Sequence, residues 1–436
     1  MTARREPRLI RRGVLWLLLL GPLFFISYGL SNTYTATRSD VGTLVFDWES
    51  QLPLWPWTII PYWSIDLLYG LAFLLPLTRR EMDRHALALL TAQCVCVMGF
   101  LLWPLRFTFD RPALDGGFGW MFDVLMGFDK PFNQAPSLHI ALLVIIWTMF
   151  ARHVHAQPWR WLVHGWMALI GVSVLTTWQH HFIDVPSGAL VGLLCLWLWP
   201  AHGALPWQQA ALARDSRRWR LAAAYGLGAG LCAALALTVG GLALCLLWPA
   251  VSLLLVALNY AWLGAAGFQK GADGRLSMAA TLLLAPYLAA AALNAWCWTH
   301  KRPQADEVCA GVFLGRVPST QDAAAFAAVV DLSAERPCTA RIAHYRSLPS
   351  LDLVAPDRAA LAQAAAEIET LRHHGPLLVC CALGYSRSAS AVAAWLLLTG
   401  RSATVAQAEA LIRHARPGMV LHDGHRRVLG ALEQQR

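Results

Sequence analysis

A cysteine, a glycine and an arginine follow one another at three-residue intervals in the segment 379–388, directly before an apolar helical run over 391–398. The backbone N–H groups of such a loop, with a helix N-terminus behind them, can surround a tetrahedral oxyanion. Arg387 would add a bidentate grip, and the helix N-terminus would hold Cys381 as the thiolate. The spacing therefore indicates a thiol nucleophile that acts on phosphate esters.

A second group of ionisable residues lies nearer the N-terminus. His180 and Asp184 are four residues apart and share a face on a helical turn, so Asp184 can fix the imidazole tautomer and stabilise its cation. Such a histidine is a competent nucleophile toward phosphorus, and His139 can protonate the leaving oxygen. Arg106 and Arg111 would neutralise the developing phosphoryl charge. The alternative is that these histidines only cap helix ends at the membrane interface.

The composition of the chain indicates an integral membrane protein. Of 436 residues, 57% are hydrophobic and 14% are charged, which is far from the average of soluble domains. The net charge of +9 comes largely from arginines between apolar runs, which is typical of membrane topology signals. No nucleic-acid-binding motif and no paired zinc spacing are present, so neither a nucleic-acid partner nor a metal or other cofactor is expected.

Hydrophobic runs predict a polytopic α-helical membrane domain followed by a small α/β domain. Six predicted spans in 1–205 precede a basic cytoplasmic linker over 206–219, two or three further spans within 220–300, and a soluble domain over 303–436. The first six spans lie near 14–31, 58–77, 86–105, 138–151, 160–178 and 185–201. The later runs cover 221–268, which is long enough for two spans around Gly240 and Gly241, and 278–298.

The arginines between these spans predict the topology. They favour a cytoplasmic N-terminus and place the segments with His139 and His180 on the outer side of a bacterial-type inner (plasma) membrane, facing the periplasm. A reactive thiol beside a second cysteine would be oxidised outside, so the C-terminal domain is expected in the cytoplasm. This requires an even number of spans, with either a re-entrant segment around Pro286 or a wrong division of 221–268.

The residues of the membrane domain resemble the type 2 phosphatidic acid phosphatase superfamily. That family carries an Arg-Pro, a Pro-Ser-x-His and a His-x-x-x-Asp element in this order across six spans. The matching positions are Arg111-Pro112, Pro136-Ser137-x-His139, and His180 with Asp184. The resemblance implies that His180 forms a phosphohistidine, Asp184 orients it, His139 is the general acid, and Arg106, Arg111 and Ser137 bind phosphate.

Three positions depart from the phosphatase pattern. Pro104 and Val174 stand where the family has a lysine and an arginine, and Leu138 stands where phosphatases usually have glycine. In these respects the chain is similar to the inositol phosphorylceramide synthase branch of the superfamily. Head-group phosphotransfer to an alcohol therefore stays open beside hydrolysis of a lipid phosphate.

The C-terminal domain resembles the dual-specificity branch of cysteine-dependent phosphatases over roughly 306–436. Strands over 311–316, 328–332 and 376–379 and a helix over 361–372 lead to the signature His-Cys-x-x-Gly-x-x-Arg-Ser. The signature is matched at Cys381, Gly384, Arg387 and Ser388.

This second resemblance implies a cysteinyl-phosphate on Cys381, with Arg387 on the equatorial oxygens and Gly384 and Ser386 in the phosphate-binding loop. Ser388 would ease departure of the thiolate. The implied general acid is Asp352, with Asp357 as the runner-up. Cys380 stands where the family has histidine, which is expected to slow or retune catalysis.

The leading hypothesis is a bifunctional membrane phosphatase or phosphotransferase. Its histidine site would act on lipid phosphates or phospholipid head groups, and its cysteine site on a phosphomonoester, with phosphoproteins as a further candidate. The alternative is a membrane-anchored sensor of phosphorylated ligands with a catalytically weak C-terminal domain. A lipid transporter with a regulatory phosphatase is a third reading, and the near absence of ionisable residues within 221–298 argues against it.

Overall fold

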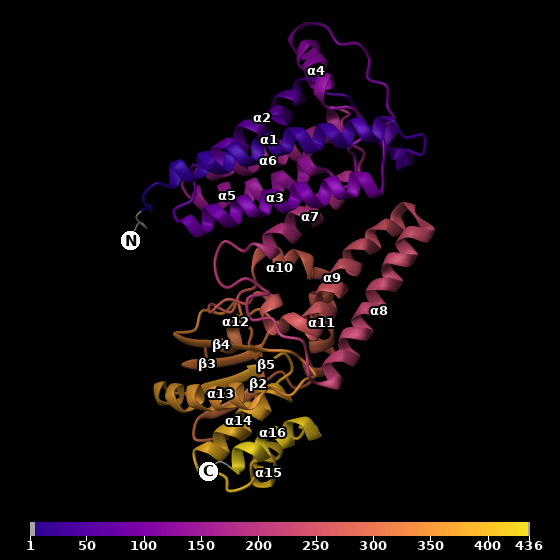
Figure 1. Cartoon of the computed structure of the whole chain (residues 1–436). Helices are drawn as coiled ribbons and strands as arrows, with labels where there is room; N and C mark the ends of the chain where they lie inside the picture. Colours follow the sequence, from indigo (N-terminus) through magenta and orange to yellow (C-terminus); the bar gives the residue numbers. More distant parts are fainter. Residues whose placement is uncertain (1–4, 435–436) are drawn as a thin grey trace. The chain divides into compact units, whose positions relative to one another are not determined.

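The computed structural model describes residues 5–434, so the predicted domains that begin at residue 1 and end at residue 436 lie partly outside it. The chain divides into two compact units, Met1–Ala204 and Leu205–Arg436. The first unit is helical, and the second combines further helices with the α/β domain (Figure 1).

The first unit is a bundle arranged around α5. This helix contacts α2, α3, α6 and α7 (Figure 1), and almost every apolar residue on its inner side is buried. Helices overlap all six predicted spans, and α4 occupies part of the polar segment 106–137. The helices are α1 Leu9–Ala36, α2 Ile59–Ala72, α3 Arg79–Leu102, α4 Gly116–Phe128, α5 Leu138–His153, α6 Trp159–Thr176 and α7 Asp184–Leu198, with the 3-10 turns η1 Asp47–Gln51 and η2 Pro56–Thr58.

The second unit begins with a pair of helices that turn back on each other. α8 (Ser216–Val239) starts where the side chain of Asp215 accepts a hydrogen bond from the N–H of Arg217. Gly240 and Gly241 have φ of 67° and 53°, a region that favours glycine, and they reverse the chain. It continues through η3 (Gly241–Leu246), α9 (Leu247–Leu258), the π-helical η4 (Asn259–Leu263) and η5 (Gly264–Phe268).

Four helical stretches in the described part of the chain are long and apolar enough to cross a membrane: Leu9–Ala36, Arg79–Leu102, Ser216–Val239 and Gly241–Phe268. The run predicted as a span over 278–298 is instead divided into α10 (Met278–Leu283) and α11 (Ala285–Thr299), with Pro286 in the first turn of α11. The number of spans and the side of the C-terminal domain stay predictions.

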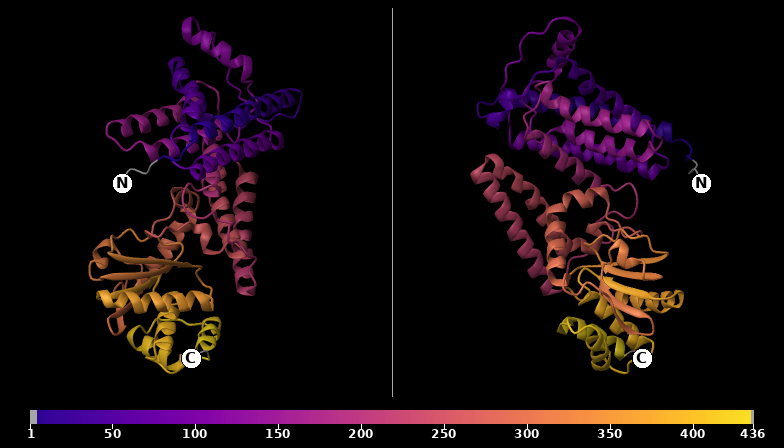
Figure 2. Two further views of the ribbon diagram at one scale, coloured as in Figure 1. Left: turned by 60° about the vertical axis from the view of Figure 1, so that its left-hand side comes forward. Right: turned by 180° about the vertical axis from the view of Figure 1, so that it is seen from behind.

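The α/β domain has a five-stranded sheet in the order β1-β2-β5-β3-β4, in which only β1 is antiparallel. α13 and α14 pack against one face, and α15 and α16 contact α14 (Figure 2). The elements are β1 Asp306–Cys309, β2 Val312–Arg316, α12 Thr320–Ala323, β3 Ala328–Ser333, β4 His344–Ser350, α13 Arg358–Leu371, η6 Arg372–His374, β5 Leu377–Cys381, α14 Arg387–Leu398, α15 Val405–Ala415 and α16 Asp423–Glu433.

A buried lysine joins the preceding helices to this sheet. Lys270, in the loop after η5, has a fully buried side chain whose Nζ lies 2.6 Å from Oδ2 of Asp331 on β3. The same ammonium donates to the carbonyl and hydroxyl of Ser333 and to the carbonyl of Arg336. All its donors are thereby used, as a buried charge requires. The α/β domain is thus built onto the helical segment rather than loosely linked to it.

Candidate active sites

The loop between β5 and α14 gathers donors on the sulfur of Cys381. The N–H of Gly384 lies 3.3 Å from Sγ, and the hydroxyl of Ser388 donates to it over 3.2 Å. Gly384 has a φ of 75°, and a Cβ there would collide with the backbone of Gly315 and Arg316. Only glycine satisfies both constraints. Hydrogen-bond donors favour a charged acceptor, so this loop can hold a thiolate.

Arg387, at the first turn of α14, is buried and held by charge. Its Nη1 and Nη2 donate to the two carboxylate oxygens of Glu335 over 2.9 and 2.6 Å, and Nη1 also donates to the carbonyl of Ser350 over 2.8 Å. Burial raises the pKa of Glu335, but the charge and hydrogen bonds of Arg387, a backbone hydrogen bond and the charge of Lys270 together turn the net direction of that pKa downward. Nε of Arg387 is buried and has no partner among residues 5–434, so it can serve a phosphate oxygen.

Asp352 lies beside this arginine. Its Oδ1 is 3.1 Å from Nη2 of Arg387, and its backbone carbonyl accepts a hydrogen bond of 3.0 Å from the hydroxyl of Tyr260. Asp352 and Cys381 line the same cavity, of about 860 Å³. Asp357 instead caps α13, where its carboxylate accepts the N–H of Ala360 over 2.8 Å. Of these two carboxyl groups, Asp352 therefore shares a cavity with Cys381, and its role as the proton donor stays a prediction.

Three further residues support the loop, and no local sequence pattern points to them. Glu335 holds Arg387, and Nε2 of His425 lies 3.1 Å from the hydroxyl of Ser386. Burial, together with His422 and Arg217, lowers the pKa of His425 to about 4, so its ring is neutral near pH 7. The third is Arg416.

Arg416 contacts the loop through a hydrogen bond and a ring contact. It is fully buried, donates to Asp306 over 2.7 Å, and extends a longer bond of 3.4 Å to the carbonyl of Leu383. Its guanidinium also lies 4.9 Å from the ring centre of Tyr385, a cation–π distance. Arg416 thereby connects β1 to the loop that carries the thiol.

Cys380 and Cys381 lie on opposite faces of the sheet because side chains alternate along a strand. Cys381 packs with the helix-covered face, whereas Cys380 is grouped with Val329 and Leu378 on the other face. Burial raises the pKa of the Cys380 thiol well above its usual range, and Asp331 adds to that shift. Cys380 is therefore an inert core thiol in this structure, and its effect on catalysis stays a prediction.

In the first unit, His180 contacts residues at the starts of two helices, α5 and α7. Nδ1 of His180 lies 3.0 Å from Oδ2 of Asp184, and its Nε2 lies 3.2 Å from the hydroxyl of Ser137. Ser137 also caps α5, and Asp184 opens α7, where its charge suits the helix N-terminus. Both contact partners of His180 therefore lie at the N-termini of helices. Nδ1 of the neighbouring His181 lies 3.0 Å from Oε2 of Glu49.

His139 and His180 line one cavity of about 110 Å³. His139 stacks on the ring of Tyr62 at 4.3 Å, and its Nε2 is buried without a partner in the described part of the chain. Asp66 and Asp129 line this cavity as well, and the residues that line it include no arginine or lysine. Sequence reasoning missed both carboxylates, which make the cavity poorer for a phosphate than expected.

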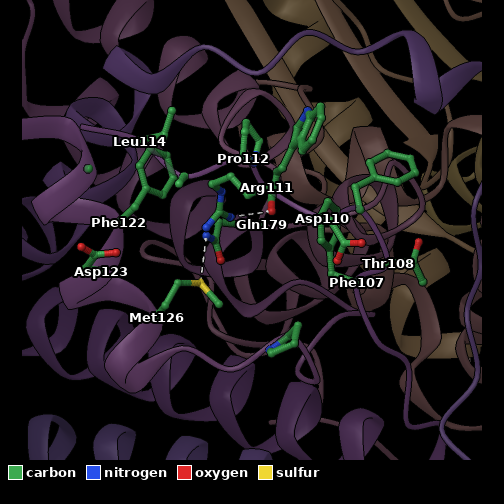
Figure 3. A pocket seen from close by; sticks show the side chains of 15 residues that line it. Phe107, Thr108, Asp110, Arg111, Pro112, Leu114, Phe122, Asp123, Met126 and Gln179 are labelled. Carbon is green, nitrogen blue, oxygen red and sulfur yellow. Dashed lines mark hydrogen bonds between the residues drawn. The ribbon is translucent and has the colours of Figure 1, made fainter. Parts of the chain in front are cut away.

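The two arginines predicted for this site are placed differently. Arg111 lines a neighbouring cavity of about 400 Å³ (Figure 3). Its guanidinium donates to the carbonyls of Thr177 and Trp178. Gln179, the residue before His180, lines the same cavity, and its amide contacts the sulfur of Met126 at 3.8 Å (Figure 3). Arg106 lines neither cavity. His139 and His180 thus share a cavity, and His180 contacts Asp184 and Ser137, whereas neither arginine lines that cavity.

No family model and no curated protein matches the chain. Solved structures of phosphatases are similar to about 30% of it. Human DUSP28 shares 26% identity, with 30% of this chain and 95% of that chain covered and a TM-score of 0.28. Tk-PTP in the active form shares 26% identity over 31% and 99% of the two chains, with a TM-score of 0.27. PTPMT1 in complex with PI(5)P shares 17% identity, with 30% of this chain and 95% of that chain covered and a TM-score of 0.28.

Proposed function

We propose that the second unit is a cysteine-dependent phosphomonoester hydrolase. The observation that carries this proposal is the arrangement at the end of β5: two donors on the sulfur of Cys381, with Arg387 and Asp352 paired beside it. A nucleophile and an anion-binding group at the β5–α14 loop, with a proton donor beside them on the loop after β4, are the parts that phosphoryl transfer needs. A purely binding site would need neither Asp352 nor the hydroxyl of Ser388.

The proposed reaction has two steps. The thiolate of Cys381 attacks phosphorus, so that an S–P bond forms and the P–O bond to the alcohol breaks, while Asp352 gives its proton to the leaving oxygen. Water then attacks phosphorus, Asp352 takes the proton of that water, and the S–P bond breaks to release phosphate and the thiolate. Ser388 donates to Sγ and stabilises the charge returning to sulfur. Arg387 neutralises the equatorial oxygens throughout.

We also propose a second phosphoryl-transfer site at His180 in the first unit. Its support is the contact between His180 and Asp184, together with the cavity that His180 shares with His139. Nε2 of His180 would attack the phosphorus of a lipid phosphate or phosphodiester head group, and His139 would protonate the leaving oxygen. The acceptor of the phosphoryl group would be water or an alcohol.

The location that we propose is a bacterial-type inner membrane, with the histidine site facing the periplasm and the cysteine site the cytoplasm. The four apolar helical stretches support membrane insertion. The arginines between the runs support the orientation. A reporter fused after the C-terminus that is active only in the cytoplasm should be active, and an inactive reporter would overturn the orientation.

The test of both activities compares the full-length wild-type protein with Cys381→Ser and His180→Ala. Substrates are p-nitrophenyl phosphate, a lipid phosphate, a phosphodiester lipid and a phosphotyrosine peptide. Cys381→Ser should abolish phosphomonoester turnover, and His180→Ala should leave turnover of p-nitrophenyl phosphate unchanged. The cysteine proposal fails if Cys381→Ser retains full activity. The histidine proposal fails if His180→Ala changes no lipid reaction.

A further inference from the structure

The cavity at Cys381 extends well beyond the phosphate-binding loop. One end carries Cys381, Asp352 and Ser386, which are the groups of the proposed chemistry. The rest of the wall comes in part from other residues of the α/β domain, which are Leu353, Leu383, Tyr385, Gly418, Val420 and His422, and in part from helices that precede this domain. These helix residues are Tyr225 on α8, Pro249 and Leu253 on α9, and Pro286, Tyr287, Ala290, Ala291, Asn294 and Trp298 on α11. A volume of about 860 Å³ suits a ligand much larger than phosphate.

The helix wall is apolar and uncharged. Its hydrogen-bonding groups are the amide of Asn294, the hydroxyls of Tyr225 and Tyr287, and the indole of Trp298. A peptide lying there would leave most of its backbone N–H and carbonyl groups without partners, which is costly. A hydrocarbon chain has no such groups. The wall therefore favours an alkyl chain over a polypeptide.

The same helices expose apolar side chains on their outer surfaces. Leu254 on α9 is 50% exposed, and Leu293 and Trp296 on α11 are 62% and 58% exposed. α8 and the stretch 241–268 that contains α9 are both long and apolar enough to cross a membrane. Such surfaces are typical of contact with lipid. The cavity thus has helices with membrane-type apolar surfaces on one side and the thiol of Cys381 on the other.

We infer that the cysteine site takes phosphate monoesters of lipid alcohols, with the apolar chain lying against α9 and α11 and the phosphate on the loop 381–387. This inference rests on the proposed phosphomonoester hydrolysis and names its substrate class. The contact of Tyr260 with the carbonyl of Asp352 fits it, because η4, which directly follows α9, thereby holds the loop that carries the proton donor.

The first test is a chain-length series of alkyl phosphates, from butyl to dodecyl, given below their micelle concentrations to full-length protein in nanodiscs. Each buried methylene should raise kcat/KM, by roughly fourfold if it is fully removed from water. Hydrolysis of p-nitrophenyl phosphate is followed in parallel. If that compound is hydrolysed and the alkyl series is flat, the inference is wrong while the proposed function stands. If neither is hydrolysed, the proposed function fails first.

The second test places the chain in the cavity. Ala290→Trp fills it from α11, and Ala289→Trp is the matched control because Ala289 is exposed and does not line the cavity. The slope of log(kcat/KM) against chain length is taken within each variant, so a general loss of activity cancels. The slope should flatten in Ala290→Trp and persist in Ala289→Trp.

A second pair repeats the test from the other wall. Leu253→Trp lies in the cavity on α9, and exposed Leu254→Trp is its control. Equal slopes in all four variants would overturn the assigned position of the chain. A phosphotyrosine peptide that is hydrolysed with a higher kcat/KM than dodecyl phosphate would overturn the substrate class.

Discussion

At the residue scale, Arg387 connects the parts of the cysteine site. A guanidinium buried this deeply needs a fixed counter-charge, and Glu335 supplies it with both carboxylate oxygens. Glu335 thereby fixes the arginine from behind and leaves Nε for a ligand. Asp352 touches the same guanidinium, so an incoming phosphate would compete with Asp352 for Arg387. This competition would loosen the carboxyl group at the moment when it must carry a proton.

Replacing Ser388 should separate the two chemical steps. In Ser388→Ala the sulfur of Cys381 loses one of its two donors, so release of the thiolate from the cysteinyl-phosphate should slow more than its formation. Rapid-mixing assays with p-nitrophenyl phosphate should then show a burst of nitrophenol followed by a slower steady rate. Ser390→Ala on the same helix is the control, because within residues 5–434 the hydroxyl of Ser390 donates to the carbonyl of Ser386 and not to the sulfur of Cys381. A control burst equal to that of Ser388→Ala would contradict this role.

Acid should destabilise the loop through His425. Its pKa is about 4 in the folded protein and near 6.5 when unfolded, so the unfolded chain binds the proton more readily. Stability is complete above pH 6.5 and is lost as pH falls toward 4, by about 3 kcal/mol at most. Hydrogen exchange of segment 382–398, corrected for intrinsic rates, should quicken over this window. The window should disappear in His425→Gln, and its persistence there would assign it to another group.

At the element scale, local contacts could be predicted from the sequence and long-range ones could not. The strand, loop and helix around Cys381 follow from spacing, as does the contact of His180 with Asp184 four residues on. Glu335 lies 52 residues before Arg387 and meets it only because β3 runs beside β5. The carbonyl contacts of Arg111 arise in the same way, from a chain return that no sequence pattern encodes.

The hydroxyl of Tyr260 on η4 is predicted to position the acid-bearing loop. Tyr260→Phe keeps the buried ring but loses the hydrogen bond to the carbonyl of Asp352. Because a good leaving group hardly needs a proton donor, kcat for p-nitrophenyl phosphate should change little, while kcat for an alkyl phosphate should fall several-fold. Tyr287→Phe, which alters another tyrosine of the same cavity, is the control. Equal losses on both substrates would indicate a general disturbance instead.

At the scale of the whole molecule, the sequence and the structure divide the chain differently after residue 205. Composition changes near residue 303, which predicts an independent domain from there onward. In the structure, 205–436 is one compact unit, because Lys270 and Tyr260 reach into the α/β part. A composition change indicates where the chain leaves apolar surroundings. It cannot predict the contact of the buried Lys270 with Asp331, because the two residues lie 61 positions apart in the sequence.

The fragment 205–436 is therefore expected to fold and hydrolyse p-nitrophenyl phosphate, whereas 303–436 should be much less stable. Without Lys270 the buried carboxylate of Asp331 keeps only Tyr345 and Ser333 as partners, and breaking such a pair costs about 3–5 kcal/mol. That is a large part of a domain's total stability of about 5–15 kcal/mol. Lys270→Met in the full chain removes the charge but keeps the helices, and should lower the melting temperature by roughly 10 °C. If 303–436 had the same melting temperature and the same turnover of p-nitrophenyl phosphate as 205–436, the helical segment would contribute nothing to the stability or activity of the α/β domain.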